Sequence, residues 1–114
     1  MKKTLNILQN TVFESSPYAT QEFKDFVEIL RHELYGELQR QGCQIINSKR
    51  GHFDVSGYFA KDGVMYYFSL PDVRACNLRT EHRIMYRTVS NSGDTTGGPN
   101  RWATITETGI NFVF

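Results

Sequence analysis

Apolar residues recur every three or four positions between Gln21 and Gln41, and this spacing is typical of an amphipathic helix. The apolar stripe comprises Phe23, Phe26, Val27, Leu30, Leu34 and Leu38. Thr20 precedes the stripe as a candidate N-cap, and Gly42 follows it as a candidate stop signal. At about 1.5 Å per residue the helix is long enough to lie across a small sheet. Gly36 weakens it, because glycine inside a helix costs about 1 kcal/mol relative to alanine.

Beyond Gly42 the pattern changes to alternation of apolar and polar residues, which is typical of half-buried strands. Two alternating runs, 53–60 and 64–70, are separated by Lys61-Asp62-Gly63. Asp-Gly between such runs predicts a hairpin with a two-residue turn. This turn sets a register in which three pairs share one apolar face: Phe59 with Tyr66, Gly57 with Phe68, and Val55 with Leu70.

The opposite face of this hairpin carries Tyr58, Tyr67 and Met65. If nothing covers them, these side chains form an exposed apolar patch, and such patches usually mark a partner site or an oligomer interface. This face is therefore a candidate surface for a protein partner or for a homodimer.

Two further strands are expected at some distance from the hairpin. Leu5-Asn6-Ile7 alternates briefly and predicts a short edge strand before the helix, while residues 82–89 predict a third strand of the main sheet.

The last residues predict a closing hairpin around Thr108-Gly109, which pairs Ile105 with Phe112 and ties the apolar C-terminal residues into the sheet. We therefore expect an α+β fold, with one long amphipathic helix packed on an antiparallel sheet of about five strands. Residues 1–114 are expected to form a single domain.

The composition is that of a folded chain without a membrane segment. Hydrophobic residues make up 39% and aromatic residues 13%, whereas disordered chains lack apolar surface. No apolar run approaches the roughly 20 residues of a transmembrane helix, and Asn6 interrupts the stretch that follows Lys2-Lys3, so we expect a cytoplasmic protein. Cys43 and Cys76 lack the paired spacing of zinc ligands and are expected to be reduced thiols.

The net charge of +1 conceals an uneven distribution. Residues 74–101 contain five arginines but only two acidic residues, and aromatic residues are interleaved with them. Arginines beside aromatic rings on a sheet are a common means of holding single-stranded nucleic acid. The candidate binding residues are Arg74, Arg79, Arg83, Arg87, Arg101, Trp102, Tyr58 and Tyr67. The alternative is that these arginines pair with the acidic sides of the helix and with loop carboxylates.

The arginine-rich segment also contains an unusual loop. Residues 90–100 include Gly93, Gly97 and Gly98 and no large apolar side chain. Loops of this length in compact domains are commonly either mobile or engaged in binding. The loop is therefore either a flexible connection or a recognition loop whose backbone amides form a nest for a phosphate.

A catalytic interpretation rests on histidines. His52 and Asp54 would share a strand face, and Glu81 and His82 lie beside Arg83 at the start of another strand. A histidine–glutamate pair can act as acid and base on RNA without a metal, with arginine holding the phosphate. The alternative is that each histidine is an ordinary surface residue, since none belongs to a recognised motif. No ligand spacing indicates a metal or another cofactor.

Three functional hypotheses follow, of which the first two are not enzymes. The first is a non-catalytic module that binds nucleic acid or a nucleoprotein through the arginines, the aromatic residues and the loop. The second is a protein-binding regulator or inhibitor that uses either the Tyr58, Tyr67 and Met65 face or the acidic side of the long helix. The third is a metal-independent ribonuclease. The sequence favours a binding module over an enzyme.

Overall fold

The computed structural model describes residues 1–13, 17–52, 54–70, 82–94 and 96–114. It contains two helices and six strands among these residues. The helices are α1 (Lys2–Asn10) and α2 (Gln21–Arg40), and the strands are β1 (Gln44–Arg50), β2 (Val55–Lys61), β3 (Val64–Leu70), β4 (Arg83–Val89), β5 (Arg101–Thr106) and β6 (Gly109–Ile110). The fold is therefore α+β, as expected.

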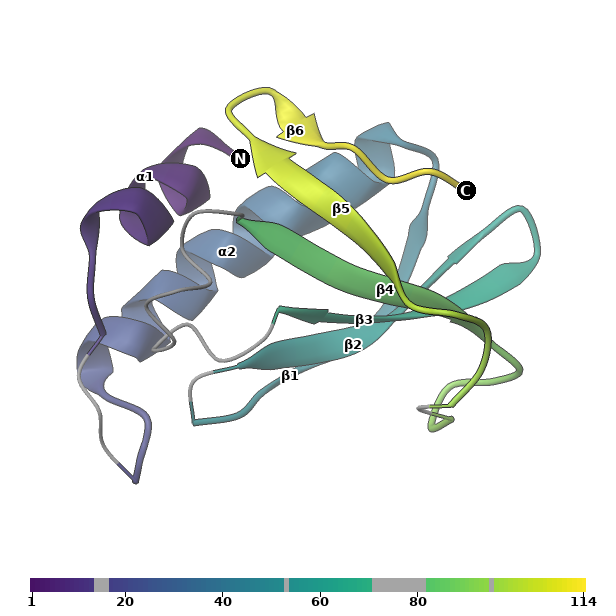
Figure 1. Cartoon of the computed structure of the whole chain (residues 1–114), viewed down its shortest axis with the longest axis horizontal. Coiled ribbons are helices and arrows are strands. Elements are labelled where there is room, and N and C mark those ends of the chain that lie inside the picture. Colours follow the sequence, from purple (N-terminus) through teal and green to yellow (C-terminus); the bar gives the residue numbers. More distant parts are fainter. Residues whose placement is uncertain (14–16, 53, 71–81, 95) are drawn as a thin grey trace.

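The strands form one antiparallel meander in which spatial order follows sequence order. The sheet curves around α2 as an open half-barrel, and α1 lies along α2 near the end of β5 (Figure 1). The core lies between α2 and the concave face of the sheet, and the opposite face carries no helix among the described residues. This layering separates an apolar inner face from an outer face that is available for contacts.

The predicted long helix is confirmed. Thr20 caps α2, since its side-chain oxygen accepts a hydrogen bond from the backbone N–H of Phe23 at 3.1 Å. Gly42 adopts a φ of +80° just after the last turn, which glycine does without strain. All six members of the apolar stripe are buried against the sheet.

The β2–β3 hairpin also matches its predicted register. Residue pairs Val55–Leu70, Gly57–Phe68 and Phe59–Tyr66 face one another, and Tyr58 lies opposite Tyr67. Asp62 and Gly63 both have positive φ, at 51° and 80°, as a type I′ turn requires.

The prediction of an N-terminal edge strand is wrong, because residues 2–10 form helix α1. Its Leu5 and Leu8 are buried at helical spacing. Glu33 of α2 serves as a distant cap, since its carboxylate accepts hydrogen bonds from the backbone N–H groups of Lys3 and Thr4 at 3.3 and 2.7 Å. The unpaired backbone N–H groups at the start of α1 thus bond to a carboxylate that is almost thirty residues away in the sequence.

Strand β1 was not expected, because its residues are mostly exposed and polar and show no clear alternation. It pairs with β2 through a register shift between Ile45 and Asn47. At this bulge the Asn47 carbonyl oxygen lies so close to Gly57 that a Cβ there would collide with it. Glycine in the middle of β2 thereby permits β1 to extend the sheet.

The closing hairpin exists, but its predicted register is wrong. Ile105 pairs with Ile110 rather than with Phe112, and Glu107 and Thr108 form the turn. Phe112 instead enters the core, where its ring lies edge-on to that of Tyr86 at 5.0 Å. The C-terminal residues are held by side chains rather than by strand pairing, since the Tyr86 hydroxyl donates to the Val113 carbonyl at 2.8 Å and accepts from its N–H at 2.9 Å.

Candidate functional site

The outer face of the sheet is the surface that points away from α2. Strand register places two rows of side chains across it. The first row consists of Lys49, Ser56, Ser69, Met85 and Trp102, and the second of Asn47, Tyr58, Tyr67 and Arg87. Arg83 lies at the start of β4, opposite Thr104, and a further row at the other end of the face consists of Gln44, Ala60, Met65 and Val89.

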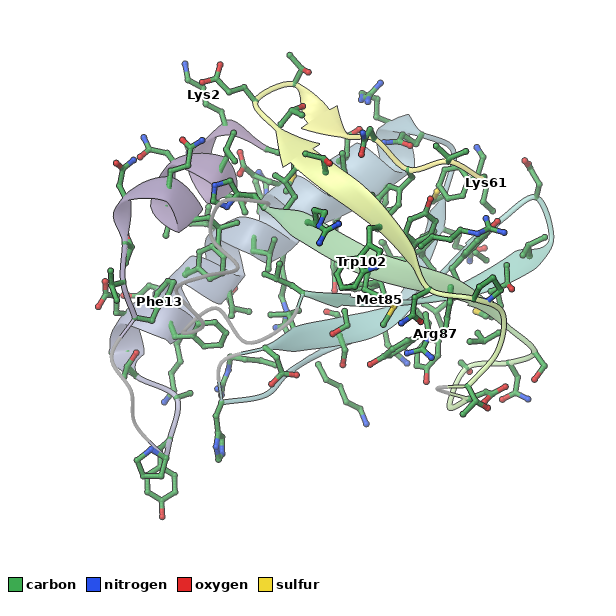
Figure 2. All side chains as sticks on the ribbon, viewed as in Figure 1. Lys2, Phe13, Lys61, Met85, Arg87 and Trp102 are labelled. Atoms are coloured by element: carbon green, nitrogen blue, oxygen red, sulfur yellow. The ribbon has the colours of Figure 1, made fainter. Side chains whose placement is uncertain are left out.

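Two arginines of β4 lie over aromatic rings of the neighbouring strands. The Arg83 guanidinium carbon is 4.7 Å from the ring centroid of Trp102 on β5, and that of Arg87 is 5.4 Å from the ring centroid of Tyr67 on β3. Both distances are within the range of a cation–π contact. Figure 2 shows Trp102, Met85 and Arg87 together on the side opposite α2. Each of these two contacts places a positive charge next to an aromatic ring on the outer face of the sheet.

Two side chains of this face differ from the rest: Trp102 has an exposed ring, and Arg87 has a buried nitrogen without a partner in the described part of the chain. Trp102 is 47% exposed, which is high for so large an apolar side chain. The Nε atom of Arg87 is inaccessible to solvent and has no hydrogen-bond partner among the described residues. Buried polar atoms normally have a partner, so this Nε atom is an unsatisfied donor within the fold and not a contact for a ligand.

The apolar patch expected at Tyr58, Tyr67 and Met65 is only partly open. Tyr58 is buried, and its hydroxyl donates to the backbone carbonyl of Asp94 at 3.2 Å. Its ring lies 5.4 Å from that of Tyr67, which Arg87 covers in turn. The exposed part of the outer face is consequently shifted toward Trp102.

The glycine-containing loop is ordered by its own polar groups. The Asp94 carboxylate accepts from the Ser90 hydroxyl at 2.9 Å and from the Thr96 N–H at 3.0 Å. These bonds, first of all the one from Ser90, lower the pKa of Asp94. The Gly98 N–H donates to the Thr88 carbonyl at 3.0 Å. Because these amides are already engaged, the geometry argues against a phosphate nest at them.

Glycine is required where this loop meets β4. A Cβ on Gly97 would collide with the Thr88 carbonyl oxygen, and Gly98 lies against the Thr88 hydroxyl. Gly93 has a φ of +103°. The three loop glycines therefore have a structural role in fixing the path by which the chain passes from β4 to β5.

The other arginines of the predicted site do not join this surface. Arg101 pairs with the core residue Tyr86, so it points to the other face, and its guanidinium donates to the Val113 carbonyl at 3.4 Å. Arg74 and Arg79 lie outside the described residues. The sequence placed Arg101 and Trp102 together, although adjacent residues of a strand necessarily face opposite ways.

The alternative that the arginines pair with the acidic sides of the long helix does not hold for Arg83 and Arg87. The sheet separates their side chains from α2. The helix carboxylates have partners of their own, such as Arg40 for Glu37 and Arg31 for Glu28. Both guanidinium groups lie over rings of neighbouring strands, and the other part of this alternative, pairing with loop carboxylates, stays open.

The residues of the ribonuclease hypothesis are not brought together in the part of the chain that the structure describes. His52 and Asp54 precede β2 instead of sharing its face, and the His52 ring lies 5.9 Å from that of Tyr18. Glu81 lies outside the described residues. The carbonyl of His82 accepts the N–H of Ile105, which continues the pairing of β4 with β5.

Cys43 is a buried free thiol, and burial raises its pKa. Cys76 lies outside the described residues. Within the ranges described, no three histidine, cysteine or acidic side chains are grouped as metal ligands, and neither helix is long and apolar enough to span a membrane.

Sequence reasoning missed Lys49, because β1 itself was not expected. Its partner in the register is Ser56, which places the lysine on the outer face. The sequence does contain two adjacent basic residues, Lys49 and Arg50, but no apolar alternation that would assign them to a strand.

We compared the chain with protein-family models, with curated proteins and with solved structures, and none of them matches it.

Proposed function

We propose that this protein is a non-catalytic module that binds single-stranded nucleic acid on the outer face of its sheet. The observation that carries the proposal is the pair of arginine–aromatic contacts, Arg83 over Trp102 and Arg87 over Tyr67. Single strands are commonly held by rings on which bases stack and by cations that follow the backbone.

The charge of this surface supports the same proposal. Lys49, Arg83 and Arg87 contribute three positive charges, whereas no residue that points outward from the described parts of β1–β5 is acidic. Asp94 at the rim has its carboxylate occupied by Ser90 and Thr96. A phosphate backbone thus meets no repulsion from the strands themselves.

The spacing of the groups favours an extended strand over a single bound phosphate. Arg83 and Arg87 are four residues apart on one strand, a distance of about 13 Å at roughly 3.3 Å per residue. A backbone that runs along β4 passes both guanidinium groups and brings a base within reach of the exposed ring of Trp102. Base stacking on an aromatic side chain contributes about 1–3 kcal/mol.

The proposal is tested by fluorescence anisotropy with labelled single-stranded DNA and RNA of mixed sequence. Three phosphate contacts predict a slope of about −2 for the logarithm of the association constant against the logarithm of salt concentration. Between about 50 and about 200 mM salt the affinity then falls roughly 20-fold. A blunt duplex of the same sequence is expected to bind more weakly, because its bases are not available for stacking.

The charge variants provide the control. Arg83→Gln combined with Arg87→Gln should abolish binding and flatten the salt dependence, whereas Lys2→Gln on α1 removes a charge remote from this face and should change little (Figure 2). Absence of binding to any single strand at low salt, or an equal loss in Lys2→Gln, contradicts the proposal.

A protein-binding regulator is the second candidate, and one observation favours it. Trp, Tyr, Arg and Met are enriched in protein interfaces, and all four occur on this face, with the Trp102 ring half exposed. The same titration separates the candidates, since an apolar protein contact lacks the steep salt dependence of phosphate binding.

A further inference from the structure

An open cleft of about 410 Å³ is lined by residues of α1, α2 and the β5–β6 turn. These three elements meet on the side of the sheet opposite the proposed nucleic-acid surface (Figure 1). Its walls include Lys3 of α1, His32, Gly36 and Arg40 of α2, and Thr108 of the turn. Sites for small molecules commonly measure about 300–1,000 Å³. Two smaller hollows of about 220 and 200 Å³ extend the cleft along α2.

Gly36 forms part of the floor of this cleft, and packing does not account for it. Glycine destabilises a helix interior relative to alanine. A Cβ at Gly36 would meet no atom within 4 Å, whereas one at Gly109 would lie 2.7 Å from the Glu37 carboxylate. Gly36 therefore leaves the helix backbone bare at a position where the chain itself places nothing, which is the arrangement expected if a ligand lies there.

The two carboxylates that line the cleft already have hydrogen-bond partners. Glu33 accepts hydrogen bonds from Thr4 and from the Lys3 N–H, and Glu37 accepts them from Arg40 and Gln41. Both groups thus have a structural role and are not free to attract a cation.

The basic side chains of Lys3 and His32, in contrast, are exposed and form no hydrogen bond or ion pair with the described residues. An ammonium group and an imidazole N–H accordingly border the same cleft as unused donors. Bidentate recognition of a carboxylate ordinarily requires arginine, and Arg40 is engaged with Glu37. Lysine without arginine is better suited to a phosphate, which it binds as a point charge.

We infer that this cleft binds a small organic phosphate monoester. Lys3 and His32 hold the phosphate group, and the organic part lies over Gly36 toward the hydroxyl of Thr108. The site shares no residue with the outer face of the sheet, so it stands independently of the proposed nucleic-acid binding.

The inference is tested by NMR titration of the ¹⁵N-labelled full chain with ribose 5-phosphate, inorganic phosphate and unphosphorylated ribose. Saturable shifts of the amides of Lys3, His32, Gly36 and Thr108 are expected with ribose 5-phosphate. Inorganic phosphate is expected to bind at least fivefold more weakly, and ribose not at all. Equal affinity for inorganic phosphate, or an absence of saturable shifts, overturns the inference.

Variants at two positions distinguish a binding site from a structural feature. Lys3→Ala should reduce affinity for ribose 5-phosphate at least fivefold, whereas Lys2→Ala, its neighbour on α1 outside the cleft, should retain it. Gly36→Ala and Gly36→Leu should raise the melting temperature, since both are better helix formers, and should weaken binding in that order. Unchanged affinity in both Gly36 variants, or an equal loss in Lys2→Ala, contradicts the inference.

Two further readouts keep the interpretation unambiguous. The Gly36 variants should bind single-stranded DNA on the outer face as the unmodified protein does, so failure of either proposal leaves the other testable. If the amide shifts follow protein concentration instead of ribose 5-phosphate, a second copy of the chain occupies the cleft and the inference is wrong.

Discussion

The carboxylate of Glu37 lies directly against the backbone of Gly109, and a Cβ on this glycine would be 2.7 Å from both carboxylate oxygens. Glu37 is buried near the end of α2, while Gly109 begins β6. Gln41 reinforces the contact, since its side-chain amide donates to Glu37 at 2.7 Å and to the Ile110 carbonyl at 2.6 Å. The end of the long helix is thereby locked to the last hairpin.

Gly109→Ala should therefore destabilise the protein. The added methyl group must displace a buried carboxylate from Arg40 and Gln41, and disruption of such a hydrogen-bonded charge costs about 1–3 kcal/mol. The urea midpoint is expected to fall accordingly. Gly36→Ala is the matched control, because a Cβ there meets nothing, and it should raise the midpoint. A Gly109→Ala protein as stable as the unmodified chain would disprove this account of the contact.

Acid should weaken the attachment of α1 to α2. Burial tends to raise the pKa of Glu33, but hydrogen bonds from Thr4 and from the Lys3 N–H outweigh this, and its pKa is lowered. A carboxyl whose pKa is lower in the folded state stabilises the protein above its unfolded pKa, and this stability is lost as pH falls through the folded value.

Glu33→Gln should consequently unfold more easily at pH 7, by about 1–2 kcal/mol, and lose less stability than the unmodified protein on going to about pH 3. Urea unfolding at both pH values measures the two effects. Glu107→Gln, an exposed substitution in the β5–β6 turn, should remain within about 0.5 kcal/mol of the original at pH 7. An acid-induced loss in Glu33→Gln as large as that of the unmodified chain would count against the cap.

Removal of the Tyr86 hydroxyl should release the C-terminal residues. Tyr86→Phe keeps the ring in the core but removes both hydrogen bonds with Val113, at a cost of about 1 kcal/mol. Hydrogen exchange at the Val113 amide should accelerate. Tyr67→Phe on the outer face serves as the control and should leave that exchange rate unchanged.

Trp102→Ala should weaken binding to single-stranded nucleic acid by about 1–3 kcal/mol, if the ring is the stacking platform. Trp102→Phe should recover most of the affinity, since a smaller ring still stacks. The side chain is half exposed, so the stability of the fold should change little. Thr104→Ala, on the same face of β5, tests for a general effect of substitution on this strand, and a loss equal to that of Trp102→Ala would argue against stacking.

The parts of the fold that the sequence predicts are those governed by local rules. The apolar stripe on α2 and the Asp62-Gly63 turn specify their elements through periodicity and backbone conformation alone. The sequence does not distinguish helix α1 from a strand, because an apolar–polar–apolar run of three residues, Leu5-Asn6-Ile7, occurs in both. The hydrogen bond that caps the helix is accepted by Glu33, almost thirty residues away in the sequence.

The errors in the sheet have similar causes. Strand β1 has little apolar character of its own and depends on the bulge that Gly57 accommodates. In the register of the final hairpin Gly109 lies against Glu37, a tertiary contact without a sequence signature.

Alternation correctly predicted that Tyr58 and Tyr67 face away from the core, and it already implied that Arg101 and Trp102 cannot share a face. It could not show that Tyr58 would be covered by the loop at Asp94, or that Arg83 and Arg87 would lie over rings of neighbouring strands. Those relationships depend on which strands become neighbours.

The sequential order of the sheet has a kinetic consequence. Each strand pairs with the one that precedes it, and closing loops between neighbours in sequence costs less entropy than closing distant contacts, so the meander should assemble quickly. The contact between Gln41 and Ile110 spans 69 positions and, together with the contacts of α1 with β5, closes the long loops of the fold. Docking of the final hairpin is then the slow event. Until it occurs, the apolar inner face beside the end of α2 stays uncovered, and exposed apolar surface of this kind favours aggregation.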